Sequence, residues 1–318
     1  MGQAGNQRIT KSKQSSRAPE MRTELAHKIA EHAPNVGDYA TAISGLTLYR
    51  RTAPNACNPV VYEPSLTVLV QGRKRINLGG TSYVCDESSF VLASVDVPVV
   101  SQIVSASEEE PFLALRLALD MAVVREILTQ QELPEPVVSS QTHGIAIGKT
   151  TEELLSACTR LMDLLNNPED IPFLGNMLQR EIVYRLLRGP QGHRLRAIAT
   201  LGDQSNRTAK AIGWLRANFN KPLRLEELAA AARMGMSTLH HQFRALTAMS
   251  PLQYQKQLRL NAARDRMLMD GLDAASAAFE VGYESASQFS REYRRFFGQP
   301  PIRDIRARRL SSSAMIRD

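Results

Sequence analysis

Cysteine is scarce in this chain of 318 residues. The three cysteines, Cys57, Cys85 and Cys158, lie far apart in the sequence, and none belongs to a CxxC motif. This spacing excludes the disulfide frameworks of small secreted domains and offers no zinc-finger pattern. The sequence therefore predicts reduced thiols and no metal site.

Long hydrophobic runs are also lacking. An apolar stretch at residues 90–106 is interrupted by Asp96, Pro98 and Gln102, whereas a membrane-spanning helix needs roughly 18 uncharged apolar residues. The first residues are polar and basic and contain no apolar segment like that of a secretory signal. We therefore expect a cytoplasmic protein with no membrane contact, in which residues 1–30 form a flexible basic tail.

Signatures of enzyme chemistry are missing from the sequence. It has no histidine between His32 and His143, and no GxSxG elbow, P-loop or dinucleotide-binding fingerprint. A metal-dependent oxygenase or isomerase built on this region would lack its imidazole ligands. We therefore predict a protein that is not an enzyme, with no catalytic residues and no cofactor.

The overall composition is that of a globular protein, but the charge is unevenly distributed. Residues 205–318 hold 19 lysines and arginines against 10 acidic residues, whereas residues 1–204 hold 20 against 22. A basic domain attracts nucleic acid through counterion release, so the predicted partner is double-stranded DNA. A merely solvated basic surface is the alternative that charge alone leaves open.

Two different patterns divide the first 204 residues. Short β-rich runs separated by turns fall at residues 65–70, 75–78, 82–85, 89–93, 97–104 and 112–119. They predict a small barrel or sandwich within residues 42–119, and helical periodicity follows at 121–131, 150–165 and 172–187. The apolar stripe of the last helix fits either packing against the barrel or a dimer interface, and consists of Leu174, Met177, Leu178, Ile182 and Leu186.

The last third of the chain contains one pattern twice. Helices are predicted at residues 225–232 and 236–246 around a turn at 233–235, and again at 277–281 and 285–296 around a turn at 282–283. The apolar stripe of the second helix recurs at an offset of 50 residues, as Leu239, Phe243 and Leu246 and then Phe289, Tyr293 and Phe296. This arrangement predicts two helix-turn-helix units.

One long helix is predicted between the two units, at residues 251–269. Its buried side is expected to carry Leu252, Leu258, Ala262, Ala263 and Met267. A rigid connecting helix would hold two reading helices on one face of a duplex, in adjacent major grooves about 34 Å apart.

The polar faces of the two reading helices supply the predicted DNA contacts. In the first helix they are Met236, Ser237, Thr238, His240, His241 and Arg244, and in the second they are Ser285, Ser287, Gln288, Arg291, Arg294 and Arg295. Arg291 is suited to donate two hydrogen bonds to guanine, whereas Arg294 and Arg295 are expected to contact phosphates. Ser285 and Gln288 predict a capping box at the start of their helix.

These residues resemble a known family. The segments GMSTLHHQFRALTAMSPLQYQKQLRL and AAFEVGYESASQFSREYRRFFGQPP look like the paired helix-turn-helix domain of AraC/XylS-type transcription regulators, over about residues 206–305. The resemblance implies base-facing positions at Ser237, His241, Ser287 and Arg291, and RNA polymerase as a partner. Where the family usually has Gly-Met-Ser at the first turn, this chain has Arg233 at the leading position, and a left-handed backbone there would cost about 1 kcal/mol.

The N-terminal part is similar to the cupin-like regulatory half found in one branch of that family, over roughly residues 40–190. The similarity implies control by a small-molecule effector. Cys57 and Cys85 are candidate electrophile or redox sensors, because the basic residues 73–75 lie close in sequence to Cys85. Buried cysteines without a chemical role are the alternative.

Together these patterns predict an α+β chain in five parts. They are the tail at 1–30, a cupin-like barrel at 31–135, a helical connector with a possible homodimer interface at 136–204, a domain with two helix-turn-helix units at 205–310, and a tail at 311–318. The predicted function is sequence-specific transcription regulation controlled by an effector, with an activator and a repressor both compatible with the sequence. A metabolite-converting cupin enzyme tethered to DNA by the basic domain, and an architectural DNA binder indifferent to sequence, are the alternatives.

Overall fold

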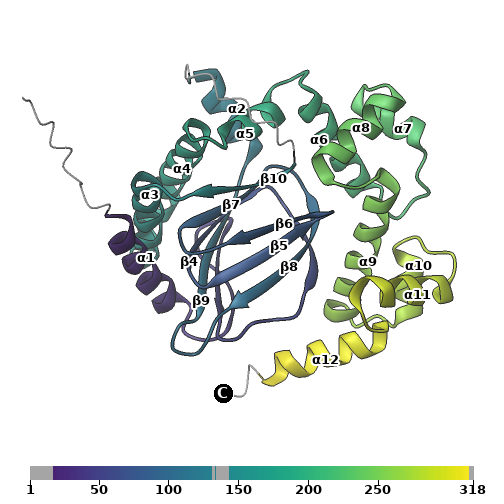
Figure 1. The fold of residues 1–318 in the computed structure, drawn as a ribbon, viewed down its shortest axis with the longest axis horizontal. Coiled ribbons are helices and arrows are strands. Elements are labelled where there is room, and N and C mark those ends of the chain that lie inside the picture. The colour runs from purple at the N-terminus through teal and green to yellow at the C-terminus, as the bar shows by residue number, and fades with distance from the viewer. Residues whose placement is uncertain (1–16, 131–132, 134–142, 315–318) are drawn as a thin grey trace, which may run out of the picture.

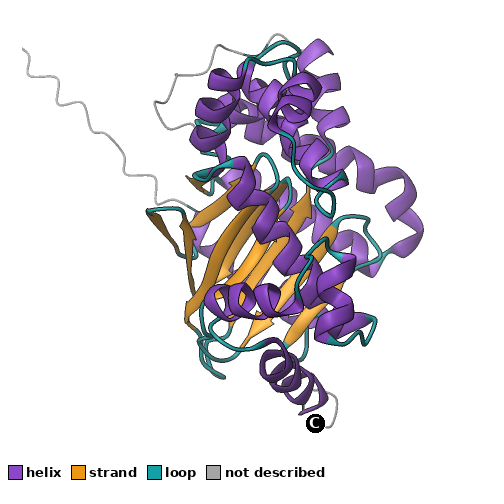
Figure 2. Ribbon diagram, turned by 90° about the vertical axis from the view of Figure 1, so that its right-hand side faces the viewer, coloured by secondary structure: helices purple, strands orange, loops and turns teal. Residues whose placement is uncertain are grey.

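The computed structural model describes residues 17–130, 133 and 143–314. A β-rich N-terminal domain occupies the centre of the molecule, with one group of helices on one side and the helical C-terminal domain on the other (Figure 1). Figure 2, in which the side of the C-terminal domain faces the viewer, shows helices in front of the strands. The predicted α+β class, with a β domain followed by an all-α domain, is confirmed.

Two antiparallel sheets form the β domain. The larger has the order β1-β2-β9-β4-β7-β10 and the smaller the order β3-β8-β5-β6. Their strands are β1 (Gly37–Ala40), β2 (Leu46–Arg51), β3 (Asn58–Tyr62), β4 (Ser65–Gln71), β5 (Arg73–Leu78), β6 (Thr81–Cys85), β7 (Ser89–Ala93), β8 (Val97–Ser105), β9 (Phe112–Ala118) and β10 (Ile145–Lys149). Six of these match the predicted β-rich runs, whereas β1, β2, β3 and β10 were not predicted individually.

Both faces of the larger sheet are covered, which explains its nearly continuous apolar strands. Along β4, Leu66 and Val68 pack into the core beneath the N-terminal helices, while Leu69 joins the cluster that includes Ile76 of the smaller sheet. The helices of this part are α1 (Ala18–His32), α2 (Met121–Gln130), α3 (Glu152–Asp163), α4 (Asn176–Arg188) and α5 (Gly192–Ala199), with short turns η1 (Leu164–Asn166), η2 (Pro168–Asp170) and η3 (Ile171–Gly175) between α3 and α4.

Three of the predicted boundaries need correction. Residues 18–30 belong to α1 and are not a flexible tail, because Leu25 and Ile29 are fully buried in the core; residues 1–16 lie outside the described part. The connector at 136–204 is not purely helical, because β10 adds a strand beside β7. The tail predicted at 311–318 begins inside α12 (Pro301–Ala314), and only residues 315–318 lie outside the described part.

The apolar stripe of α4 is divided between two environments. Ile182 and Leu186 are buried in the core beneath the larger sheet, which supports packing as their role. Leu174 and Met177, at the start of the same stripe, are exposed. The dimer interface therefore stays a prediction that concerns this exposed end alone.

Seven helices form the C-terminal domain. They are α6 (Gln204–Ala217), α7 (Leu225–Ala232), α8 (Met236–Thr247), α9 (Pro251–Met269), α10 (Ala274–Glu280), α11 (Ala286–Phe297) and α12. Helix α9 has the predicted bounds and lies between the α7–α8 pair and the α10–α11 pair (Figure 1). The prediction of its buried side was partly wrong, because Leu252 is exposed, whereas Tyr254 and Leu260 are buried.

Candidate nucleic-acid interface

Each helix-turn-helix unit buries the apolar stripe of its second helix. In α8, Leu239 and Phe243 are fully buried, and in α11, Phe289 and Tyr293 are fully buried. Aromatic edge contacts join Phe243 to Tyr254 of α9, and Phe289 to Tyr283 of the turn before α11. These contacts fix the rotation of both helices, so that the opposite faces point to solvent.

All twelve side chains predicted to contact DNA are exposed. The exposed residues are Met236, Ser237, Thr238, His240, His241 and Arg244 on α8, and Ser285, Ser287, Gln288, Arg291, Arg294 and Arg295 at the start of and along α11. Exposure makes them available to a duplex. Their individual DNA contacts remain predictions.

The turns of the two units share a residue with positive φ and the same pattern of backbone hydrogen bonds. Arg233 adopts φ 52° and ψ 48°, which is the left-handed conformation expected from the sequence. The Arg233 and Met234 amides donate to the carbonyls of Ala230 and Ala229, a pairing that satisfies the last carbonyls of α7. In the second unit the Gly282 and Tyr283 amides make the equivalent bonds, with Gly282 at φ 89°.

Glycine is required at only one of these two turns. A Cβ on Gly282 would lie 2.0 Å from the carbonyl oxygen of Asn220, a distance that sterics forbid. Arg233 is exposed, so its side chain is accommodated and only the conformational cost remains. The first unit thus tolerates a residue that the second excludes.

Helix capping differs from the prediction. The Ser285 hydroxyl accepts from the Gln288 amide at 3.3 Å, but the Gln288 side chain points along the helix to Glu292 and does not return to the Ser285 backbone. Only half of the predicted capping box therefore forms. A complete box starts α9, where Ser250 and Gln253 bond reciprocally.

Arg259 of α9 joins the two units, a role that the sequence did not reveal. Its guanidinium donates to the Phe219 carbonyl at 2.6 Å and the Lys221 carbonyl at 2.8 Å, both in the loop between α6 and α7. It also donates to the Gly282 carbonyl at 2.8 Å, in the turn of the second unit. One side chain therefore ties the turn of the second reader to the scaffold of the first.

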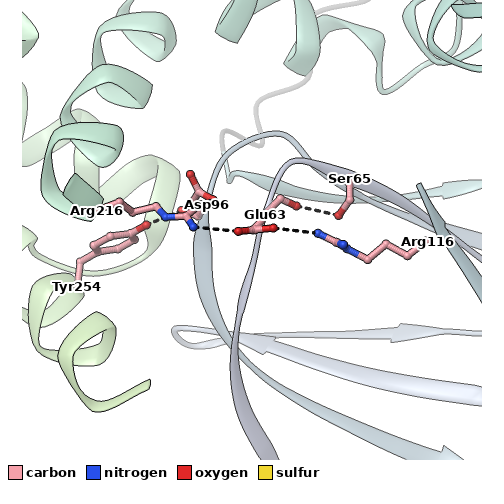
Figure 3. Close-up of polar contacts among 6 residues, drawn as sticks. All are labelled: Glu63, Ser65, Asp96, Arg116, Arg216 and Tyr254. Atoms are coloured by element: carbon pink, nitrogen blue, oxygen red, sulfur yellow. Dashed lines mark hydrogen bonds and ion pairs between the residues drawn. The ribbon is translucent and has the colours of Figure 1, made fainter. Parts of the chain in front are cut away.

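The C-terminal domain packs against the β domain through a polar network (Figure 3). Glu63, in the loop between β3 and β4, accepts from Arg216 of α6 at 2.9 Å and from Arg116 of β9 at 3.4 Å. Arg216 also pairs with Asp96, whose backbone carbonyl accepts from the Tyr254 hydroxyl at 2.9 Å. The Arg216 guanidinium beside Glu63 lowers the pKa of that carboxyl, whereas burial raises the pKa of Asp96.

A cavity of about 380 Å³ opens beside this network in the β domain. Tyr49, Tyr62 and Phe112 contribute aromatic surface to its wall. Its charged lining residues are Asp38, Arg51, Glu63, Lys74 and Arg116.

The cysteines occupy different environments. Cys57 is exposed, with its Sγ 3.6 Å from Oε1 of Gln102, whereas Cys85 and Cys158 are buried. Burial raises the pKa of the Cys85 thiol to about 12, despite the nearby Lys74. The prediction that Cys85 is a reactive sensor is therefore wrong, because its thiolate is disfavoured and its sulfur is inaccessible.

Residues 17–130, 133 and 143–314 contain neither a metal-binding cluster nor a membrane-spanning helix. Over these ranges, no three His, Cys, Asp or Glu side chains gather in a group able to hold a metal ion. Across the same part of the chain, no helix combines the length and apolarity required to span a membrane.

Sequence comparisons identify both halves of the chain. Residues 42–194 match the N-terminus of AraC-type transcriptional regulators, and residues 228–307 match a helix-turn-helix domain. The chain is 28% identical over 153 residues to the HTH-type transcriptional regulator ArgR of Pseudomonas aeruginosa, which covers 48% of this chain and 46% of that protein. It is 31% identical over 105 residues to the HTH-type transcriptional activator RhaS of Yersinia pestis, which covers 33% of this chain and 38% of that protein. The chain thus aligns with less than half the length of these curated relatives.

Structural comparison finds a fold shared over most of the chain. An apo structure of a ToxT variant from Vibrio cholerae superposes with a TM-score of 0.58 at 12% identity, covering 84% of this chain and 98% of that one. Wild-type ToxT with a bound unsaturated fatty acid gives a TM-score of 0.56 at 12% identity, covering 85% and 96%. The chain therefore combines the N-terminal domain of AraC-type transcriptional regulators with a helix-turn-helix domain.

Proposed function

We propose that this protein is a sequence-specific DNA-binding transcription regulator whose C-terminal domain reads two adjacent major grooves. The observation that carries the proposal is the pair of exposed, donor-rich faces on α8 and α11, each held by a buried apolar stripe. The basic balance of residues 205–318 supplies attraction to phosphate. Arg259 supports a fixed relation between the two reading helices.

The N-terminal domain is proposed to bind a small-molecule effector. Its cavity is large enough for a small ligand, has aromatic walls and polar groups, and lies beside the contact with the C-terminal domain. The matched AraC-type N-terminus supports a regulatory role. A cupin-like character of this domain belongs to the same proposal.

The remaining parts of the proposal concern partners and location. We infer a cytoplasmic activator that contacts RNA polymerase, that is not an enzyme, and that forms a homodimer through the exposed start of α4. The RhaS relative is named a transcriptional activator. Phe173 and Leu174 of η3 and Met177 of α4 form an exposed apolar surface where α4 begins.

The experiment that tests DNA reading compares Arg291→Ala with Arg294→Ala in the full chain. Preferred duplexes are first selected from a random library with the wild-type protein. Arg291→Ala is expected to lose about 1–3 kcal/mol of discrimination at one base position, because a bidentate contact to guanine is removed. Arg294→Ala is expected to weaken binding to selected and random duplexes alike, because a phosphate contact carries no sequence information. Equal losses on both duplexes for both variants would contradict the proposal.

A further inference from the structure

The cavity of the β domain has an excess of positive charge where a ligand would lie. Arg51 is neutralised by Asp38, with which it forms an ion pair. Lys74 stands 5.1 Å from the Tyr62 ring centre, and within the part of the chain that the structure describes no carboxylate lies within ion-pair distance of its ammonium. Among the carboxylates of the described residues, Arg116 reaches Glu63 alone, at 3.4 Å. Lys74 and Arg116 therefore line the cavity together with one carboxylate, Glu63, which Arg116 shares with Arg216.

The uncharged lining residues indicate the chemistry of the remainder of a ligand. Tyr49, Tyr62 and Phe112 offer flat apolar surface, and Thr67 and Ser101 offer hydroxyls. A cation pair beside aromatic walls is complementary to a small molecule that carries one carboxylate on an apolar or aromatic body.

Glu63 connects this cavity to the C-terminal domain. It lines the cavity, yet its shorter contact is with Arg216 of α6, at 2.9 Å against 3.4 Å for Arg116. A ligand carboxylate that pairs with Arg116 competes with Glu63 for this arginine, so that Glu63 keeps only its ion pair with Arg216. The ligand's negative charge, on the cavity side of Glu63, also repels the Glu63 carboxylate. Both effects move Glu63 toward Arg216.

The contact at Arg216 leads on to the first reading helix. Arg216 pairs with Asp96, the Asp96 carbonyl accepts from Tyr254, and the Tyr254 ring lies edge-on to Phe243 of α8, with the ring centres 5.3 Å apart. Each step is a direct contact, and Figure 3 shows Arg216, Asp96 and Tyr254 meeting at the junction of the two domains.

We propose that the cavity binds a small carboxylate through Arg116 and Lys74, and that this carboxylate transfers Glu63 from Arg116 to Arg216 and so strengthens the docking of α6 on the β domain. The inference rests on the proposed function, of which it specifies the effector class and the route of regulation. Occupation of the cavity and docking of the C-terminal domain are then thermodynamically linked.

The route can be tested without any ligand, since Arg116→Gln mimics neutralisation of Arg116. The readout is amide hydrogen exchange in α6, supported by the fluorescence of the single tryptophan, Trp214, in that helix. Arg116→Gln is expected to slow exchange in α6 about two- to fivefold, and Glu63→Gln to accelerate it by a similar factor, as for partly exposed ion pairs. In the Glu63→Gln background, Arg116→Gln is expected to have no further effect. The same effect of Arg116→Gln in both backgrounds would show a general structural role and overturn the route.

The ligand class is tested on the wild-type chain with para-hydroxyphenylacetate and its neutral amide as probes. Titration calorimetry is expected to show the acid binding about tenfold more tightly than the amide, because only the acid pairs with both cations. Lys74→Gln is expected to remove this preference. Arg73→Gln, a neighbouring exposed position on β5, is the matched control and is expected to retain it. Equal binding of the two probes, or binding of neither, would overturn the carboxylate assignment.

The two proposals fail separately. The acid is also expected to slow exchange in α6 in the wild type but not in Glu63→Gln, and an unchanged α6 in acid-bound wild type would overturn the route. A wild-type protein that selects a DNA sequence but ignores the acid contradicts this inference alone. A protein in which the acid slows α6 exchange, but which binds all duplexes equally, contradicts the proposed DNA reading alone.

Discussion

Burial controls the reactivity of single side chains in this protein, as the cysteines show most directly. Cys85 lies on β6 close to Lys74, which favours the thiolate, but burial outweighs that charge and raises the pKa to about 12. The thiol of Cys85 is therefore held in its protonated, unreactive form. Closeness to basic residues in the sequence was therefore a misleading sign of reactivity.

We expect a disulfide reagent such as Ellman's reagent to modify one thiol per folded chain, that of Cys57. Cys57 is exposed, whereas Cys85 and Cys158 are buried and disfavour ionisation. The absorbance of the released thiolate counts the reacted groups. Cys57→Ala should remove the rapid phase, and Cys85→Ala should leave it unchanged. Rapid labelling of folded Cys57→Ala would show that a buried thiol becomes accessible, and would restore Cys85 as a candidate sensor.

At the scale of a helix, the start of α11 depends on one hydroxyl. Ser285 accepts from the Gln288 amide, whereas the Gln288 side chain bonds to Glu292. Ser285→Ala is expected to destabilise the C-terminal domain by about 1 kcal/mol, the usual value of an N-cap. Gln288→Ala is expected to change the free energy of unfolding by only a few tenths of a kcal/mol, because the Gln288 side chain makes no hydrogen bond to the Ser285 backbone.

Urea unfolding followed by circular dichroism measures the loss of stability in Ser285→Ala and in Gln288→Ala. The control is Gln253→Ala at the start of α9, where the reciprocal bond is present. It should destabilise the domain more than Gln288→Ala does. Equal effects of the two glutamine variants would mean that the two boxes close alike in solution.

The capping residues also show how far sequence patterns determine helix detail. Ser-x-x-Gln occurs at both Ser250 and Ser285, and the pattern does not reveal which glutamine has a competing partner. The bounds of α7 and α9 were predictable because their periodicity is strong and local. Strand β10 was not, since its five residues become a strand only by pairing with β7, more than fifty residues earlier.

Side-chain contacts between segments that lie far apart in the sequence could not be predicted from it. The exposed reading faces of α8 and α11 followed from spacing alone, because burial of one stripe exposes the other side. Arg259 and Arg216 look like ordinary surface residues of helices, and their partners are carbonyls and carboxylates elsewhere in the fold. Only the assembled chain shows which arginines bind other parts of the protein and which stay exposed.

At the scale of the whole molecule, the two domains meet at separate points along the C-terminal domain. Arg216 pairs with Glu63 and Asp96 near the cavity. Arg264 of α9 donates to the Pro59 carbonyl at 2.7 Å while its guanidinium lies 4.1 Å from the Phe297 ring centre. Because these points lie on α6 and α9, a change in docking would act on the scaffold that carries both readers.

A further meeting point, at the end of α8, is Gly79 in the turn between β5 and β6. A Cβ there would lie 2.7 Å from Cβ of Ala248, the residue that ends α8. Gly79→Ala is therefore expected to push this turn away from α8, with about 1 kcal/mol of additional strain because φ at Gly79 is +57°. Hydrogen exchange at the end of α8 should accelerate, since the contact that shields it is lost.

Gly80→Ala is the matched control for this contact. A Cβ on Gly80 meets no atom within 4 Å, and its φ is not left-handed. Exchange at the end of α8 should stay as in the wild type in Gly80→Ala, although both variants alter the same turn. Acceleration by both substitutions alike would mean that flexibility of the hairpin, and not its contact with Ala248, governs α8. Acceleration by Gly79→Ala alone would show that a β-turn of the N-terminal domain restrains the first reading helix.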